Sequence, residues 1–289
     1  MGQLLQQVLS GLATGGIYAS LALALVMIYQ ATETVNFAQG EMAMFSTYIA
    51  WTLMQAGFSF WAAFPLTVAV SFLGGVLIER IAIRPVENAP VLSQVIVFIG
   101  LLVIFNALAG WIYTYTVKEF PSPFPDRPLL HAMITSRDLG VIGVTLAMLV
   151  LLYLFFRFTP LGLAMRAAAQ NPASARLVGI RVGWMLALGW GLAAAVGAVA
   201  GIMVAPILFL DPSMMSGVLL YAFAGALLGG ISSAGGAVVG GLIMGVLENL
   251  VGTYLIASEL KLTVALAIII LVLVVKPSGL FGVPVVRRV

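Results

Sequence analysis

Long apolar runs without polar alternation limit what this chain can fold into. Val141–Phe156 and Leu262–Val275 contain no charged residue and show no period-two pattern. In a lipid bilayer each backbone polar group needs a partner within the protein, so only helices and closed barrels span it. Barrel strands alternate polar and apolar residues, and these runs do not. The sequence therefore predicts membrane-spanning α-helices.

Composition supports the same conclusion. Of the 289 residues, 62% are hydrophobic and 8% are charged, whereas a soluble domain has about 25% charged residues. At about 20 residues per crossing, this length accommodates about eight to ten helices. Apolar segments cover residues 5–29, 42–57, 60–79, 92–114, 139–157, 183–206, 217–232, 236–257 and 262–275.

Two of these segments, 42–57 and 217–232, are short and adjoin a break in the apolar pattern. The first break is the polar Gln30–Glu41, and we interpret the glycine-rich Gly229–Gly236 as its counterpart in the second half. Non-helical backbone at membrane depth persists only where it is buried in protein or lines a cavity. We expect an all-α polytopic membrane protein, a bundle of about nine helices with broken helices, forming one transmembrane domain over 1–289.

Lysine and arginine are unevenly distributed between the loops, which predicts the orientation of the chain. If the loop with Arg80 and Arg84 is cytoplasmic, nine basic residues lie on that side and four on the other. The nine are Arg80, Arg84, Arg157, Arg166, Arg176, Arg181, Lys276, Arg287 and Arg288. The four are Lys118, Arg127, Arg137 and Lys261. This orientation places the N-terminus outside and the C-terminus in the cytoplasm, and it explains the basic net charge without nucleic acid as a partner.

The sequence lacks motifs that enzymes and primary pumps need. It has no cysteine, and its single histidine, His131, falls in a loop where we expect a surface residue. It contains neither HExxH nor the Gly-Lys-Ser/Thr of a P-loop. We therefore expect no catalytic site, no metal, no cofactor and no ATP hydrolysis by this chain.

A carboxylate at membrane depth predicts a functional site. Glu248 falls within the segment 236–257. The alternative interpretation is that Glu248 lies at the membrane interface or caps a neighbouring helix. The first break contains Glu41 in the run Asn36–Glu41. The alternative interpretation of this run is a hydrated loop between two helices. We assign five residues to a substrate pathway, namely Asn36, Phe37, Gly40, Glu41 and Glu248.

The strongest local signal is the cytoplasmic segment Thr159–Arg181. Leu161–Gln170 is rich in alanine and predicts a short helix. Asn171 and Pro172 then form a helix N-cap followed by proline at the first helical position, and Gly179 is placed to end the second helix. This basic helix–turn–helix is either a membrane-surface helix or a docking surface for a cytosolic partner.

Four motifs occur together along the chain. They are NFAQGE at Asn36–Glu41, GLAMRAAAQNPASARLVGI at Gly162–Ile180, GGISSAGGAVVGG at Gly229–Gly241, and KPSGLFG at Lys276–Gly282. Together they resemble the LivH-type permease subunit of bacterial ABC importers for branched-chain amino acids, over nearly the full length. Two positions depart from the family pattern: Gln39 stands where histidine is frequent, and Lys276 where arginine is common.

The resemblance implies a permease subunit of the bacterial inner membrane that forms the translocation pathway for branched-chain amino acids. It implies as partners a second, LivM-like permease, two cytosolic ATPases and a periplasmic binding protein that meets segments 117–138 and 207–216, with membrane lipid around them. It assigns ATPase coupling to Gly162, Arg166, Asn171, Pro172 and Gly179. Urea, amides and other amino acids are alternative substrates in the family. A self-sufficient channel is a further alternative, and an intramembrane enzyme is disfavoured because no paired catalytic side chains are visible.

Overall fold

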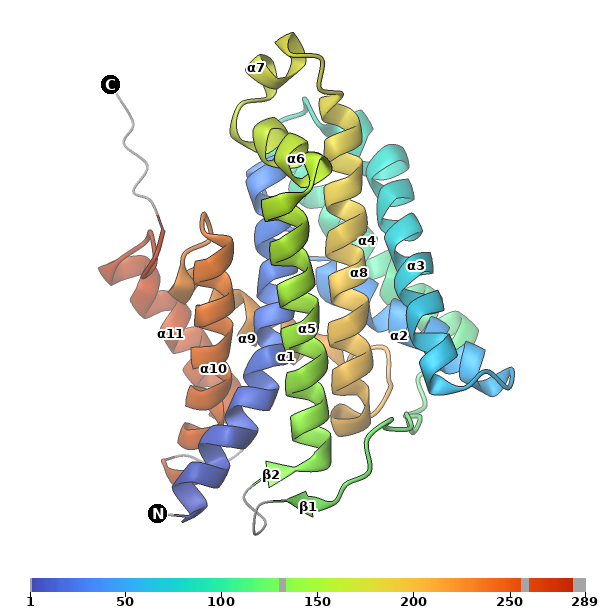
Figure 1. Ribbon diagram of the computed structural model, residues 1–289, viewed down its shortest axis with the longest axis vertical. Coiled ribbons are helices and arrows are strands. Elements are labelled where there is room, and N and C mark those ends of the chain that lie inside the picture. Colours follow the sequence, from blue (N-terminus) through green and yellow to red (C-terminus); the bar gives the residue numbers. More distant parts are fainter. Residues whose placement is uncertain (1, 130–133, 256–259, 283–289) are drawn as a thin grey trace.

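The structure is a computed structural model that describes residues 2–129, 134–255 and 260–282. This part of the chain forms eleven α-helices and one short hairpin (Figure 1). The helices are α1 Gly2–Thr32, α2 Gln39–Gln55, α3 Phe60–Ile78, α4 Val91–Tyr113, α5 Ser136–Phe158, α6 Pro160–Gln170, α7 Pro172–Leu177, α8 Val182–Leu208, α9 Met215–Gly229, α10 Ala234–Tyr254 and α11 Lys261–Val275. The hairpin pairs β1 (Pro128–Leu129) with β2 (Ile134–Thr135) in antiparallel register. The single histidine, His131, lies outside the described residues.

Each of the nine predicted apolar segments corresponds to one helix. Six helices are long and apolar enough to cross a membrane, whereas α9 and α11 have 15 residues each and α2 has 17. One further π-helical turn, Glu79–Ile83, and one 3-10 turn, Arg84–Val86, extend α3. The prediction of an all-α polytopic membrane protein is confirmed.

Helices α1 and α8 form the centre of the bundle. Most of each helix is buried, whereas most side chains of α3, α4 and α5 are partly or fully exposed. Trp111 and Leu151 are examples of such outward-facing residues. In water these faces would be unfavourable, but in a bilayer they contact acyl chains. The exposure pattern therefore agrees with lipid as the solvent around the helices.

Glycines allow the central helices to pack with their backbones in contact. A Cβ atom on Gly11 would approach the Val246 Cα to 2.8 Å, and one on Gly225 would approach the Gly241 Cα to the same distance. These glycines belong to small-xxx-small pairs of α1, α9 and α10, namely Gly11/Gly15, Gly225/Gly229 and Gly241/Gly245. Small residues are the usual means of close helix packing in membranes, so side chains at these positions would separate the helices.

The two halves of the bundle repeat the same packing pattern in opposite orientation. Helices α1 and α8 run in opposite directions (Figure 1). In this repeat α1, α2 and α3 correspond to α8, α9 and α10. The contact of α1 with α10 matches that of α8 with α3, and the contact of α2 with α8 matches that of α9 with α1. The pairs α2–α4 and α9–α11 are related in the same way. The arrangement is that of an inverted repeat, which is common among transporters.

The repeat corrects the sequence assignment of the second break. Helices α1 and α8 are each followed by a short non-helical segment and a short helix, so the counterpart of the first break is 209–214 and not Gly229–Gly236. The residues Glu33 and Phe209, which follow α1 and α8, both adopt left-handed backbone, with φ of 56° and 64°. The Gly229–Gly236 segment is instead a tight turn between α9 and α10, in which the Ser233 hydroxyl accepts from the Gly236 amide at 3.0 Å. The assignment of Gly229–Gly236 as the second break rested on its glycine content, but these glycines allow close backbone packing at this turn.

Candidate functional site

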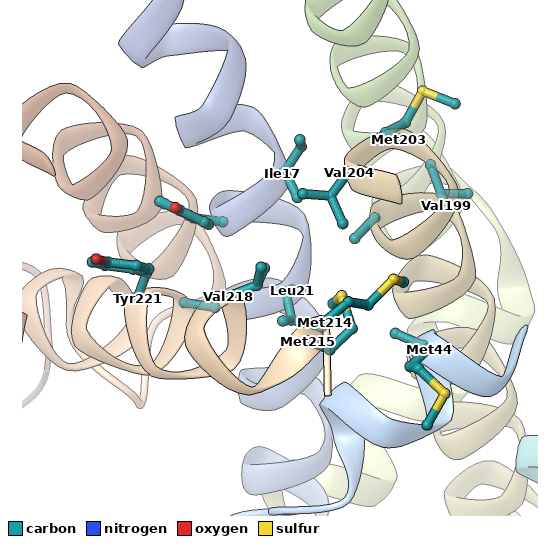
Figure 2. Close-up of a cluster of buried hydrophobic side chains, with 14 of the residues drawn as sticks. Ile17, Leu21, Met44, Val199, Met203, Val204, Met214, Met215, Val218 and Tyr221 are labelled. Carbon is teal, nitrogen blue, oxygen red and sulfur yellow. The ribbon is translucent and has the colours of Figure 1, made fainter. Parts of the chain in front are cut away.

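Helices α2 and α9 both begin inside the bundle, where their N-termini lie next to each other. A Cβ on Gly40, in the first turn of α2, would lie 3.3 Å from the Leu219 Cβ and 3.5 Å from the Met215 Cβ of α9. Figure 2 shows Met44 of α2, Met214 and Met215 at the start of α9, and Leu21 of α1 around this junction. The apolar core of the molecule is therefore centred on the point where the two broken helices meet.

Two buried amides hold the first break in place. The Asn36 side chain accepts from the Ala38 amide at 3.0 Å and donates to the Gln39 Oε1 at 3.3 Å. The Gln39 Nε2 then donates to the Ala193 carbonyl oxygen of α8 at 2.9 Å. Both side chains are fully buried. Asn36 thus closes the turn that precedes α2, and Gln39 attaches this turn to the neighbouring long helix.

Glu41 lies at the junction with polar residues from two other segments. Its carboxyl group interacts with the Asn106 side chain of α4 and is close enough to Asp211 for an electrostatic interaction. The Asn106 Nδ2 also donates to the Pro212 carbonyl oxygen at 2.8 Å, and the Ser213 amide donates to Asp211 at 2.6 Å. Glu41 is buried, and its Oε2 has no hydrogen-bond partner among the described residues. We name Glu41, Asn106 and Asp211 the junction cluster.

A cavity of about 290 Å³ opens beside the junction cluster. It is lined by Asn106, Tyr115, Val117, Asp211, Pro212 and Ser213. The cavity lies beside the backbone bridge between Lys118 and Leu210, next to the end of α8 that points away from α6 and α7 (Figure 1). Aromatic residues lie near it, with the Tyr48 and Tyr113 rings stacked at 4.4 Å. The junction cluster is therefore reached by a polar opening from one end of the bundle.

The other two predicted pathway residues lie apart from the junction cluster. Phe37 is 39% exposed and leaves the buried part of the break. Glu248 of α10 accepts a hydrogen bond from the Tyr18 hydroxyl at 2.7 Å and lies 3.6 Å from the Lys261 Nζ. These two partners give Glu248 a local role in holding α1, α10 and the start of α11 together.

The sequence analysis did not identify Asn106 and Asp211 as site residues. Asn106 is the one amide in the second half of the apolar segment 92–114, and Asp211 follows α8 directly before Pro212. Polar side chains inside apolar segments are a general signal of function in membrane proteins. That signal was available for Asn106, whereas its proximity to Glu41 depends on packing between distant segments.

Helices α6 and α7 form where the sequence predicted a helix pair, and Asn171 is the N-cap of α7 as predicted. The Thr159 hydroxyl accepts from the Gly162 amide at 2.9 Å and caps α6, and the Asn171 Oδ1 accepts from the Ser174 amide at 2.9 Å and caps α7. Pro172 is the first residue of α7, and Gly179 follows its end with a φ of 84°. Helices α6 and α7 lie at the end of the bundle opposite the start of α1 and the hairpin (Figure 1).

The tip of this helix pair is exposed. Leu177 and Val178 are 88% and 77% exposed, although both are apolar. Arg166 is also exposed, whereas Gly162 is buried because a Cβ there would approach the Phe156 Cα to 2.7 Å. Exposed apolar side chains beside cationic ones are typical of a protein interface. The tip therefore has the character of a docking surface.

Comparison with known proteins places the chain in a family. Residues 7–273 match the family described as the branched-chain amino acid transport system permease component. The chain belongs to this family. The high-affinity branched-chain amino acid transport system permease protein LivH of Escherichia coli K12 is 34% identical over 99% of this chain and 97% of its own length. BraD of Pseudomonas aeruginosa, described in the same words, is 31% identical over 99% and 98%.

One solved structure shows a similar fold. The structure of PsaBC from Streptococcus pneumoniae in complex with Fab contains a chain with a TM-score of 0.51. Its sequence identity is 14%, and the likeness covers 93% of this chain and 91% of the other. At this identity the likeness concerns the fold alone, and it extends over the whole helical bundle.

Proposed function

We propose that this chain is the membrane-spanning permease subunit of an ABC importer and carries branched-chain amino acids across the bacterial inner membrane as one domain over residues 1–289. Family membership supports the transport role, and the names of LivH and BraD supply the substrate class. The structural observation that carries the proposal is the junction of α2 and α9 beside Glu41, Asn106 and Asp211.

The junction has the chemistry to recognise a zwitterionic amino acid. Neither α2 nor α9 has a side-chain cap at its N-terminus, so their free amides and positive dipole ends are suited to a carboxylate. The carboxyl groups of Glu41 and Asp211 are suited to an ammonium group. Met44, Met214 and Met215 provide an adaptable apolar surface for a branched side chain.

The two ends of the bundle suit the remaining partners. With α6 and α7 in the cytoplasm, the tip of the helix pair would insert into an ATPase, and Gly162, Arg166, Asn171, Pro172 and Gly179 would couple hydrolysis to transport. The outer segments 117–138 and 207–216 would then meet a periplasmic binding protein. A second, LivM-like permease would complete the pathway across the exposed faces of the bundle. This orientation places the N-terminus outside and the C-terminus inside.

Proteoliposomes test the importer proposal directly. The chain alone should neither hydrolyse ATP nor accumulate leucine, because its sequence has no P-loop. The complete complex with ATPases and binding protein should accumulate leucine when ATP is supplied. Leucine accumulation by the chain alone would instead favour the self-sufficient transporter.

Glu41→Gln tests the junction cluster. Removing the charge while keeping the size should lower leucine uptake by about tenfold or more, as expected when one charge-assisted hydrogen bond to a ligand is lost. Arg157→Gln is the control, since it also removes one charge, at an exposed position of α5 that lies outside the junction cluster and the outer segments. Normal assembly with unchanged uptake in Glu41→Gln would show that the first break is only a structural turn.

A further inference from the structure

A second polar cavity lies at the end of the bundle that carries α6 and α7, separate from the junction cluster. Its volume is about 390 Å³. It is enclosed by the end of α1, the turns after α3, the start of α4, the first half of α8 and the helix pair α6–α7. Its polar lining includes Gln30, Glu33, Glu79, Arg84, Glu87, Asn88, Gln94, Gln170, Arg176 and Trp190. We name it the cytoplasmic cavity, because it shares its end with α6 and α7.

Two buried polar groups of the cytoplasmic cavity lack hydrogen-bond partners. Glu79 is 2% exposed and Trp190 is 1% exposed. Neither the Glu79 Oε2 nor the Trp190 Nε1 makes a hydrogen bond within the described residues. The Glu79 Oε2 has only an ion pair, at 3.7 Å from the Arg80 Nε. Buried polar groups are nearly always satisfied in native proteins, so an unpaired acceptor and an unpaired donor in one cavity indicate a ligand.

The charges around the cytoplasmic cavity are balanced. Glu33, Glu79 and Glu87 line it on the acidic side, and Arg84 and Arg176 line it on the basic side. Arg80, paired with Glu79, supplies the third positive charge. A simple cation or anion would leave one set of charges unmatched. A ligand with both an ammonium and an anionic group matches both sets.

The size and apolar lining restrict this ligand further. The volume lies at the low end of the range for small-molecule sites, which is about 300–1,000 Å³. Ile83, Pro172 and Leu186 add an apolar part to the wall. A free amino acid with an aliphatic side chain has both charges and an apolar group within this size.

We infer that the cytoplasmic cavity binds a zwitterionic aliphatic amino acid from the cytosol, and that its occupancy slows uptake. The ammonium group pairs with Glu79, and the carboxylate accepts from the Trp190 indole and pairs with Arg84 and Arg176. The cytoplasmic location of this cavity and the choice of an aliphatic amino acid rest on the proposed function. Gln170, Pro172 and Arg176 belong to the helix pair α6–α7. A bound amino acid therefore links this pair to the ends of α1 and α3 and opposes its movement with the ATPase.

Leucine binding to the complex, without its binding protein, tests the site. The measurement is calorimetric titration in nanodiscs of phosphatidylcholine and phosphatidylglycerol. Glu79→Gln and Trp190→Phe should each weaken leucine binding by about tenfold or more, whereas the control Arg157→Gln, at an exposed position outside both cavities, should leave it unchanged. Trp190→Phe keeps the ring contact with Phe98, so it tests the site even where Glu79→Gln fails to assemble. Unchanged affinity in the assembled variants overturns the proposal.

Two further arms separate this proposal from its alternatives. If leucine binding persists in Glu41→Gln, the binding site is the cytoplasmic cavity. If binding is lost in Glu41→Gln but kept in Glu79→Gln and Trp190→Phe, the binding site is the junction cluster and the cavity proposal is overturned. An ethanolamine phospholipid headgroup carries the same pair of charges. If phosphatidylethanolamine raises the melting temperature of wild type but not of Glu79→Gln, while leucine does not bind, the ligand is the headgroup and the amino-acid proposal fails.

Uptake measurements test the regulatory consequence. Proteoliposomes with the ATPases and ATP inside and the binding protein outside, preloaded with unlabelled leucine, should take up external labelled leucine more slowly than vesicles without internal leucine. Trp190→Phe should remove this slowing while retaining uptake in empty vesicles. Equal slowing in wild type and Trp190→Phe overturns the regulatory role. Absence of uptake in wild type contradicts the proposed function instead, and the binding measurement still decides whether the cavity is a site.

Discussion

At the scale of single residues, the NFAQGE motif divides into structural and chemical parts. Asn36 and Gln39 are fully buried and bonded within the break or to α8. Glu41 faces polar groups from other segments and retains an unpaired oxygen. The sequence analysis assigned Asn36 and Glu41 to the same pathway, because a run of polar residues does not reveal which side chains are already satisfied. Only the packing of α2 against α8 separates the two roles.

Gln39→Leu tests the structural part. Leucine has a similar size but cannot donate to the Ala193 oxygen or accept from Asn36, so a buried amide loses its partner. We expect the free energy of unfolding to fall by about 1–3 kcal/mol, the usual effect of an unsatisfied buried polar group. Thermal unfolding of the purified chain measures this change. Gln55→Leu, at the exposed end of α2, is the control, and equal melting temperatures for the two variants would contradict the role of Gln39.

At the scale of elements, helix bounds set by neighbouring residues were predicted well, whereas the relation between segments far apart in the sequence was not. The helix pair α6–α7 was predicted almost residue by residue, because Asn171, Pro172 and Gly179 act on their immediate neighbours. The second break was misplaced, because the segment 209–214 contains no glycine and lies next to an uninterrupted apolar run. Its equivalence to the first break becomes visible only when α8 is seen to pack against α3, and α9 against α1, as their counterparts do.

Arg166→Glu and Pro172→Gly test the coupling proposal. Charge reversal at Arg166 should weaken an ion pair with the ATPase, and glycine at position 172 should loosen the start of α7 that proline preorganises. We expect less co-purifying ATPase, or ATP hydrolysis that no longer responds to the loaded binding protein. Arg157→Glu makes the same charge change at an exposed position just before α6. Wild-type attachment and stimulated hydrolysis in both test variants would contradict coupling by α6–α7.

At the scale of the whole molecule, the inverted repeat explains why two short helices occur at all. If every helix crossed the bundle completely, no N-terminus would lie inside it. The paired breaks after α1 and α8 place the starts of α2 and α9 next to each other from opposite halves. Hydropathy predicted the number and bounds of the apolar segments, since these depend on each segment alone. The meeting of the two halves depends on glycine contacts between distant helices, which composition does not specify.

The orientation of the whole molecule can be tested because the sequence contains no cysteine. Ser122 lies between α4 and β1 and Ser174 lies in α7, and both are exposed, whereas Ser46 is buried. In cells with a permeable outer membrane, an impermeant maleimide should label Ser122→Cys, and it should label Ser174→Cys only after the inner membrane is opened. Ser46→Cys should resist labelling in both conditions. The opposite pattern would place α6 and α7 outside, where no cytosolic ATPase could reach them, so it would contradict the orientation and the coupling proposal together.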